Sequence, residues 1–276
     1  MQFTTLENST ISELTDLFNK SFADYFVKIE LTPELLQEKI NSEDVQLDKS
    51  VGIYFNNEPV GFILHAVRDT IAYNAGTGVI PSFRGKNATS KMYDFILPEL
   101  KKAGISEIVL EVMEQNTPAI KSYRKAGFNK IANLECFKGK PDTSVKNNYV
   151  EIKEVKHINF AELKEFWDWN PTWQHSVETV QKASSYKVFS AVLEGKFCGY
   201  MVANPDSGRV AQFAVNRHKR KQGIGTSLFH HLATLYDKEI SVINVDGEQP
   251  ETISFLKNLG LNPFLTQHKM KLFLTR

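Results

Sequence analysis

Apolar and polar positions form two related series of segments along this chain. Residues 11–18 carry apolar side chains three and four positions apart, which predicts an amphipathic helix, and Thr10 with Glu13 has the spacing of a capping box at its start. Residues 160–167 show the same periodicity behind Asn159, a residue type that favours helix N-termini. A short amphipathic helix therefore opens each series.

A predicted β-hairpin follows each helix. Residues 51–64 place apolar strand segments on both sides of Asn56 and Asn57, which suit a tight turn. Residues 188–202 repeat this plan. After the hairpins, both series run from a strand through a polar loop into a helix, at residues 77–95 and 211–229.

Both series end with a short strand and a small helix that stops at a glycine. Gly127 and Gly260 stand at these ends, where a helix C-terminal cap requires a left-handed residue. The spacing from Arg84 to Gly127 is 43 residues and from Arg220 to Gly260 is 40 residues. Matched order and matched spacing indicate an internal duplication.

The duplication predicts two domains of similar size. The chain has 276 residues, so each half is long enough to build its own core. The polar segment 138–148 contains Gly, Pro, Ser and Asn and resembles a linker. We therefore predict an N-terminal domain at residues 1–140 and a C-terminal domain at residues 149–276.

Composition excludes several classes of function. The chain has 33 Lys and Arg against 32 Asp and Glu, so no global field would hold nucleic acid or an anionic membrane, and we expect neither as a partner. Cys136 and Cys198 are too few for a disulfide framework and are predicted to lie in the core. The seven histidines form no HExxH motif, so no metal is expected. The absence of a signal-like start and of a membrane-length apolar run leads us to expect a cytoplasmic protein.

The segment "RKQGIG", residues 220–225, has the character of a phosphate-binding loop. Its glycines let a ligand approach the backbone, and the following helix N-terminus presents unpaired amides and positive charge. A glycine turn before a surface helix is the alternative interpretation. A nucleotide-binding P-loop fits less well, because no Lys and hydroxyl residue follow the second glycine.

The order of elements resembles that of the GNAT superfamily of N-acetyltransferases, twice over and across nearly the whole chain. The resemblance implies an α/β fold of the α+β type, with two tandem domains. Each would have a mixed, mostly antiparallel twisted sheet with two splayed central strands, flanked by helices. In this superfamily a loop of the pattern [Q/R]xxGx[G/A] binds the pyrophosphate of acetyl-CoA, and the strand before it pairs with the pantetheine arm.

The two copies match different parts of the family pattern. Residues 220–225 match the loop in full, and residues 84–89, "RGKNAT", match it in part. The second family signature, NxxA followed by a tyrosine and then GF, is complete in the first copy, at Asn116, Ala119, Tyr123, Gly127 and Phe128. The second copy has other residues at the first three positions, namely Gln249, Thr252 and Leu256.

The resemblance assigns acetyl-CoA-binding residues to both copies. They are Val79, Arg84, Gly85, Lys86, Asn87, Ala88, Thr89 and Asn116 in the first copy, and Val215, Arg220, Lys221, Gln222, Gly223, Ile224, Gly225 and Thr226 in the second. In the first loop, Asn87 is a residue that tolerates the left-handed conformation. The β-branched Thr89 is expected to crowd the phosphate and weaken binding.

Transfer to an amine requires a base for the ammonium proton and an acid for the departing thiolate. By resemblance Tyr123 is the acid, and Glu111, on the strand before Asn116, is the candidate base. A solvent-facing strand glutamate is the alternative for Glu111. The second copy has Leu256 in place of the acid, so we expect the first domain to be the catalyst and the second a cofactor-binding or structural partner.

The functional expectation is an acyl-CoA-dependent N-acyltransferase, specifically an N-acetyltransferase, that acts on a small amine by direct attack. The alternative is a tandem CoA-binding or structural module with decayed catalysis. The acceptor pocket is expected around residues 21–36 and the tryptophans of segment 167–173, which could instead pack at a domain interface. The sequence names neither the amine nor the oligomeric state.

Overall fold

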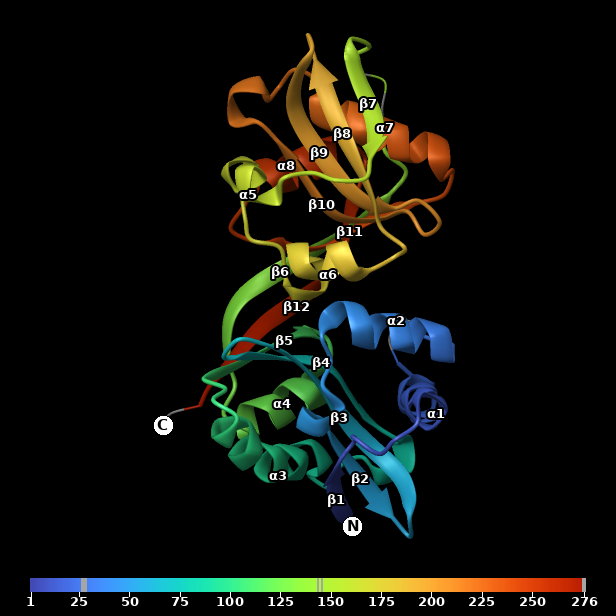
Figure 1. Ribbon diagram of the computed structural model, residues 1–276, viewed down its shortest axis with the longest axis vertical. Coiled ribbons are helices and arrows are strands. Elements are labelled where there is room, and N and C mark those ends of the chain that lie inside the picture. Colours follow the sequence, from blue (N-terminus) through green and yellow to red (C-terminus); the bar gives the residue numbers. More distant parts are fainter. Residues whose placement is uncertain (26–28, 143, 145, 275–276) are drawn as a thin grey trace. The chain divides into compact units, whose positions relative to one another are not determined.

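The computed structural model describes residues 1–25, 29–142, 144 and 146–274 and divides into two compact units (Figure 1). The first unit comprises Met1–Ile131 together with His268–Arg276, and the second comprises Ala132–Gln267. The division is not a simple cut of the chain, because its last residues belong to the first unit.

The first unit is a sheet with helices on both faces. Its elements in chain order are β1 (Gln2–Thr5), α1 (Ile11–Phe22), α2 (Pro33–Glu43), β2 (Val51–Phe55), β3 (Glu58–Arg68), β4 (Ile71–Val79), α3 (Ala88–Lys102), β5 (Glu107–Met113) and α4 (Thr117–Lys125). The strand order is β1-β2-β3-β4-β5, and β12 (Asn262–Phe273) follows β5. Helices α3 and α4 pack on the core face, and α1 and α2 lie on the other face (Figure 1).

The second unit repeats this plan. Its elements are β6 (Asn129–Gly139), β7 (Val150–Val155), α5 (Phe160–Leu163), α6 (Val177–Lys182), β8 (Lys187–Leu193), β9 (Lys196–Asn204), β10 (Arg209–Val215), α7 (Ile224–Leu235), β11 (Ile240–Asp246) and α8 (Pro250–Asn258). The strand order is β6-β11-β10-β9-β8-β7. Helices α7 and α8 cover its main core.

Each sequence repeat gives the last part of its final strand to the other unit. Strand β6 follows α4 of the first repeat, yet it pairs with β11 of the second unit, with Phe137 opposite Val242. Strand β12 follows α8 of the second repeat, yet the Leu274 amide donates to the Ser106 carbonyl oxygen at 2.8 Å, beside β5. The predicted domains 1–140 and 149–276 follow the repeat in sequence, whereas the compact units differ from them by this exchange.

The central parallel strands separate in both units, as the resemblance implies. Strand β4 pairs with β5 only from Ile71 to Tyr73, and β10 pairs with β11 only at Arg209 and Val210. In each unit the register shifts close to this point, in β3–β4 at Leu64/His65 and in β10–β9 at Val210/Gln212, which leaves one extra residue on β4 and on β10. Because a bulge bends its strand, each of these strands leaves its parallel neighbour and opens a wedge.

Several local predictions are confirmed. Thr10 and Glu13 form the complete capping box at the start of α1. Asn56 and Asn57 have φ of 50° and 66°, as a tight hairpin turn requires. Gly127 and Gly260 follow α4 and α8 with φ of 100° and 90°. These features are local, so the sequence determines them directly.

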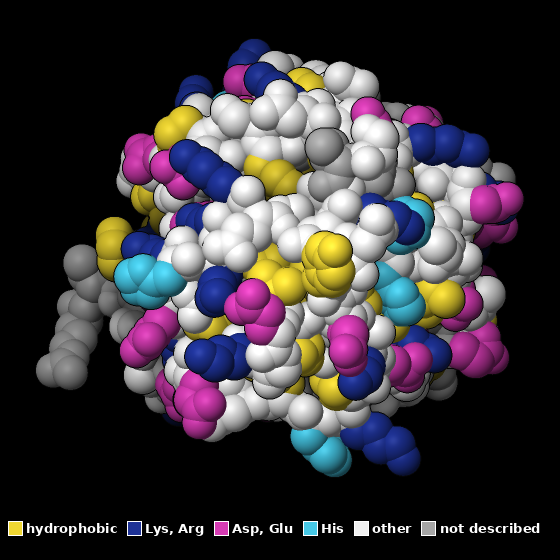
Figure 2. Space-filling model, turned by 90° about the horizontal axis from the view of Figure 1, so that it is seen from above, with side chains coloured by type: hydrophobic (Ala, Val, Ile, Leu, Met, Phe, Trp, Pro, Cys, Tyr) yellow, Lys and Arg dark blue, Asp and Glu magenta, His cyan; other side chains and the backbone are white. Residues whose placement is uncertain are grey.

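Three further expectations concern the cysteines, the surface charges and helices of membrane-spanning length. Cys136 and Cys198 are free and buried, as predicted. On the face shown in Figure 2, Lys and Arg side chains are interspersed with Asp and Glu. Among the helices of the described residues, none is long and apolar enough to cross a membrane.

Candidate active site

The two phosphate-type loops have the same backbone conformation, although their sequences differ. The first loop has left-handed residues at Gly85 and Asn87, with φ of 78° and 57°. The second has them at Lys221 and Gly223, with φ of 61° and 77°. The left-handed positions coincide, and only the placement of the glycine changes. Asn87 thus adopts the left-handed conformation that Gly223 has in the second loop, because asparagine tolerates the left-handed region.

The first loop presents unpaired amides at the start of α3. The first helical bond is from the Lys91 amide to the Asn87 carbonyl oxygen at 3.1 Å, so the amides of Ala88, Thr89 and Ser90 have no acceptor among the described residues. Around Gly85 the space is open, since an added Cβ would meet nothing within 4 Å. Converging amides at a helix N-terminus bind anions, so this loop fits a pyrophosphate.

The side chains of the two loop arginines are hydrogen-bonded to other groups of the protein. The Arg84 guanidinium donates to the Val79 carbonyl oxygen at 3.0 Å and to the Asp24 carboxylate at 2.7 Å. Arg220 repeats this with Val215 at 3.2 Å and Asp168 at 2.9 Å. Each arginine therefore fixes its loop to the preceding strand, which leaves the backbone amides as the main donors. A role of these two side chains in phosphate binding stays a prediction.

Tyr123 of α4 points into the wedge of the first unit. Its side chain is buried, and it interacts with Thr77 and Asn74 of β4 beyond the bulge. Burial raises the pKa of Tyr123 to about 12, although hydrogen bonds with Thr77 and Asn74 act against the rise. The phenol therefore keeps its proton at neutral pH and can donate it.

Asn116 holds the start of α4. Its side-chain oxygen accepts from the Ala119 amide at 3.2 Å, which explains the NxxA spacing as a helix cap. Its amide nitrogen lies 3.5 Å from the hydroxyl of Tyr25, a group whose pKa burial raises. Sequence reasoning did not single out Tyr25, Asn74 or Thr77, because none belongs to the family motifs. Residues 26–28, within the expected acceptor segment 21–36, lie outside the described residues.

Glu111 lies on the other face of β5 from the core. Its neighbours Leu110 and Val112 are buried in the same cluster as Tyr123, so Glu111 projects toward the side of α2. It is partly buried, and the Tyr73 hydroxyl donates to its Oε2 at 2.6 Å. Burial raises the pKa of Glu111, and the Tyr73 hydrogen bond opposes that rise. Glu111 is thus a hydrogen-bonded carboxylate and not a fully solvent-facing one.

The second unit has neither the candidate acid nor the candidate base at the corresponding positions. Leu256, which corresponds to Tyr123, is fully buried. Counting back from Gly260 as from Gly127 places Asn244 where Glu111 stands. Asn244 donates to Thr172 at 3.1 Å and accepts from Gln267 at 2.7 Å. An amide and an alkyl group cannot act as base and acid.

A chain segment ties the separated strands of the second unit together. The Gln212 side chain on β10 donates to the His175 carbonyl oxygen, and Asn244 on β11 donates to Thr172. Both acceptors belong to the short segment 172–175 before α6. The segment therefore lies at one side of this wedge and bonds to both of its strands.

Further side chains connect the start of α7 with α8. The Asp168 carboxylate accepts from Arg220 of the loop and from the Thr252 hydroxyl of α8, at 2.9 Å and 3.0 Å. The Phe255 ring packs so closely on Gly225 that an added Cβ would lie 2.9 Å from it. Trp169 packs edge-on against Phe213 of β10 with ring centres 6.0 Å apart. Phe255 of α8 thus packs directly on the start of α7, and Trp169 packs inside the second unit.

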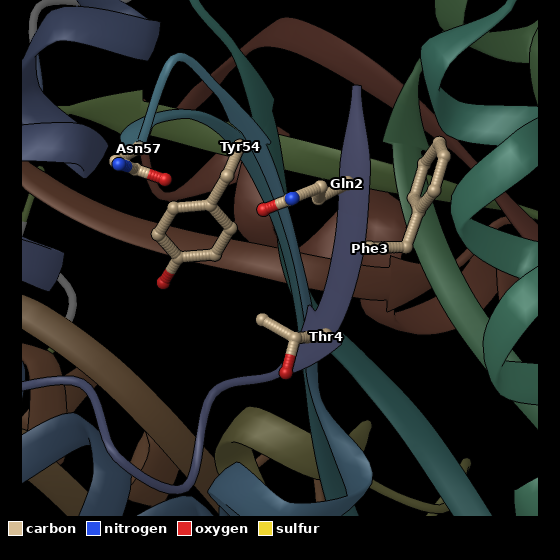
Figure 3. Close-up of a pocket in the computed structure, with 5 residues that line it drawn as sticks. All are labelled: Gln2, Phe3, Thr4, Tyr54 and Asn57. Carbon is tan, nitrogen blue, oxygen red and sulfur yellow. The ribbon is translucent and has the colours of Figure 1, made fainter.

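Other hollows and clusters do not coincide with this site. A hollow at β1 and the β2–β3 turn is lined by Gln2, Phe3, Thr4, Tyr54 and Asn57 (Figure 3). None of these residues belongs to the loop, to α4 or to β5. Among the described residues, no group of three or more His, Cys, Asp or Glu is placed to hold a metal ion.

A mixed sheet whose central parallel strands separate, a loop with unpaired amides at a helix N-terminus and a buried tyrosine at the wedge are the features that the GNAT resemblance implies. The model of the acetyltransferase (GNAT) family matches residues 11–128 and 152–261. The chain therefore belongs to this family and carries two copies of its domain.

Solved structures support the tandem fold. The chain is similar to a tandem GNAT protein from the clavulanic acid biosynthesis pathway, with 14% identity, a TM-score of 0.74, and coverage of 100% of this chain and 99% of the other. A GCN5-related N-acetyltransferase from Sphaerobacter thermophilus gives 12% identity and a TM-score of 0.74, with 100% and 96% coverage. At these identities the likeness shows the fold alone.

One curated relative matches a part of the chain. It is the [ribosomal protein bS18]-alanine N-acetyltransferase of Haemophilus ducreyi, 35% identical over 69 residues. The match covers 25% of this chain and 48% of that protein, so the chain spans about half the length of this relative.

Proposed function

We propose that this protein is an N-acetyltransferase that moves the acetyl group of acetyl-CoA to a small amine, and that the first unit performs the reaction. The observation that carries the proposal is the buried, protonated Tyr123 in a wedge whose own loop presents unpaired amides. Acid and anion site belong to one unit, as a single cofactor requires, because acid and sulfur must come within hydrogen-bond distance.

Different residues of the first unit would bind the cofactor and transfer the protons. The amides of residues 88–90 would hold the pyrophosphate, and the unpaired edge of β4 beyond Tyr73 would receive the pantetheine arm. The bound thioester supplies the acetyl group. Glu111 would take a proton from the ammonium of the acceptor, and Tyr123 would give a proton to the sulfur as the C–N bond forms and the C–S bond breaks. The second proton of the attacking nitrogen would return to the Tyr123 oxygen, which restores the phenol. No acyl-enzyme is needed.

We assign the second unit a structural role. Its loop has the complete family pattern, and Phe255 of α8 packs closely on Gly225 at the start of α7. It also lacks both catalytic groups, with Leu256 and Asn244 in their places. The better sequence match thus lies in the unit that is less suited to catalysis.

Release of free thiol from acetyl-CoA in the presence of an amine panel tests the proposal. The panel includes small primary amines, amino acids and a peptide with an N-terminal alanine, the last because of the relative's substrate. We expect amine-dependent thiol release by the wild-type protein. Acetylated amine must appear in equal amount by mass spectrometry, since water as acceptor would release thiol without it. No turnover with any amine contradicts the proposal.

The alternative function, a tandem CoA-binding or structural module, rests on the incomplete motifs of both copies. It predicts thermal stabilisation by CoA, or no response at all, without turnover. The same panel therefore separates the two functions, because only the enzyme consumes acetyl-CoA.

Substitutions in the two loops identify the unit that binds CoA. Asn87→Val should weaken CoA binding about tenfold or more, because a β-branched residue is strained at φ of 57° and the amides would no longer converge. Asn87→Gly should retain binding. Gly223→Val, the matched change in the second loop, should leave CoA affinity unchanged. Calorimetric titration with CoA measures all three, and the reverse pattern would place the ligand in the second unit.

A further inference from the structure

The exchanged strand β12 brings residues of the second sequence repeat beside the candidate base. The Leu274 amide bonds to the Ser106 carbonyl oxygen, and two side-chain contacts show that the neighbouring strands β5 and β12 run in opposite directions, so five steps along each strand place Lys269 opposite Glu111. The two contacts are diagonal to this register, one on each side of it. Lys271 lies 2.9 Å from Glu107, and the His268 ring lies 3.3 Å from Glu114. Residues opposite one another on adjacent strands share a face.

Four charged or titratable groups face Glu111 from the elements packed against it. Tyr73 of β4 donates the hydrogen bond described above, Lys39 and Glu43 come from α2, and Lys269 comes from β12. Lys39 is paired with Glu43 at 2.7 Å, and the next lysine along β12 is paired with Glu107. Lys269 has no hydrogen bond or ion pair with another described residue, so its charge is available to Glu111.

We infer that Lys269 is a positioning residue that keeps Glu111 ionised as the general base, so that the second repeat supplies part of the first unit's active site. This inference rests on the proposed function, because it takes Glu111 as the base. It also gives the strand exchange a catalytic consequence. The first repeat contains the acid, the base and the loop, but its Lys39 is paired with Glu43, so the unpaired cation beside the base comes from the second repeat.

The expected pH dependence follows from the direction of the shifts. Burial raises the pKa of Glu111, and the nearby Lys269 lowers it. A base must be deprotonated to act, so activity is present above the pKa of Glu111 and is lost as the pH falls through it. Removal of the Lys269 charge raises that pKa further, so the acidic loss of activity moves to higher pH.

The pH profile of kcat/KM with the best amine tests this inference in the full-length protein. Lys269→Met should lose activity several-fold at the acidic end and approach the wild type at the alkaline end, whereas Lys269→Arg should restore the wild-type profile. Lys271→Met is the matched control, since its lysine is on the same strand and pairs with Glu107. Its profile should keep the wild-type shape.

Other outcomes would contradict the role of Lys269 alone, or this role together with the proposed function. A uniform loss at every pH in Lys269→Met, or a profile equal to that of Lys271→Met, overturns the role of Lys269 and leaves the proposed function standing. If the Glu111→Gln variant still loses activity at acidic pH as the wild type does, Glu111 is not the general base. That result overturns both this assignment and the inference about Lys269. No turnover by the wild type overturns both.

A measurement without substrate provides a second readout. In a double-mutant cycle on the free energy of unfolding, Lys269→Met and Glu111→Gln should be coupled at neutral pH. The cycle of Lys271→Met with Glu111→Gln should be close to additive. Additivity in both cycles would contradict the interaction.

Discussion

Replacement of Tyr123 by Phe should lower kcat for acetyl transfer about 10² to 10⁴-fold, the usual contribution of a positioned acid. The phenol is buried and its pKa is about 12, so it is the protonated group of this wedge at neutral pH. The change removes one oxygen and keeps the ring contacts with Tyr93 and Phe128. Stopped-flow or steady-state assays of thiol release measure kcat.

Two controls show whether the effect is chemical. CoA should stabilise Tyr123→Phe as it stabilises the wild type, because the hydroxyl acts on the sulfur and not on the phosphates. Leu256→Met, at the corresponding place in the second unit, should leave kcat unchanged. Wild-type activity in Tyr123→Phe would remove the acid from the mechanism, and a large loss in Leu256→Met would move the chemistry to the second unit.

Met270→Ala should destabilise the first unit by about 2–5 kcal/mol, although only six residues of the printed sequence follow it. Met270 is fully buried in the first core, on the strand that the second repeat supplies. Truncation removes buried apolar surface and leaves a cavity. Hydrogen exchange monitored by mass spectrometry should show faster exchange in β2–β5, in residues 51–113, than in the strands of the second unit.

The reciprocal change should act on the other unit. Phe137→Ala removes a fully buried ring of the first repeat from the second core and should cost about 3–5 kcal/mol there. Phe273→Ala is the control, because this side chain is exposed on β12 and should be nearly neutral. If Met270→Ala instead loosened the second unit, the compact units would follow the sequence repeat and the exchange would be refuted.

The candidate site was only partly predictable from sequence. The motif identified Tyr123 and Asn116, and the structure adds Asn74, Thr77 and Tyr25 around them. These three residues come from β4 and from the segment after α1. Asn74 and Thr77 flank the bulge at which β4 turns away from β5, and a bulge leaves no clear mark in a single sequence.

The second loop shows which features a motif reports. Its pattern is complete, because the left-handed positions and the helix start are local properties. The contacts around it also involve Asp168 and Trp169, which precede it by about fifty residues, and Phe255, which follows it by thirty. No local pattern reports on such distant packing.

The sequence by itself determined the duplication, the helix caps, the hairpin turns and the family to which the chain belongs, because each depends on residue types at short spacings. Only the tertiary structure decided which unit receives the end of each terminal strand, where the parallel strands separate and which lysine stands beside Glu111. The physical reason is that strand pairing and side-chain packing join residues far apart in the chain, and either repeat's last strand can satisfy the same hydrogen bonds at a sheet edge.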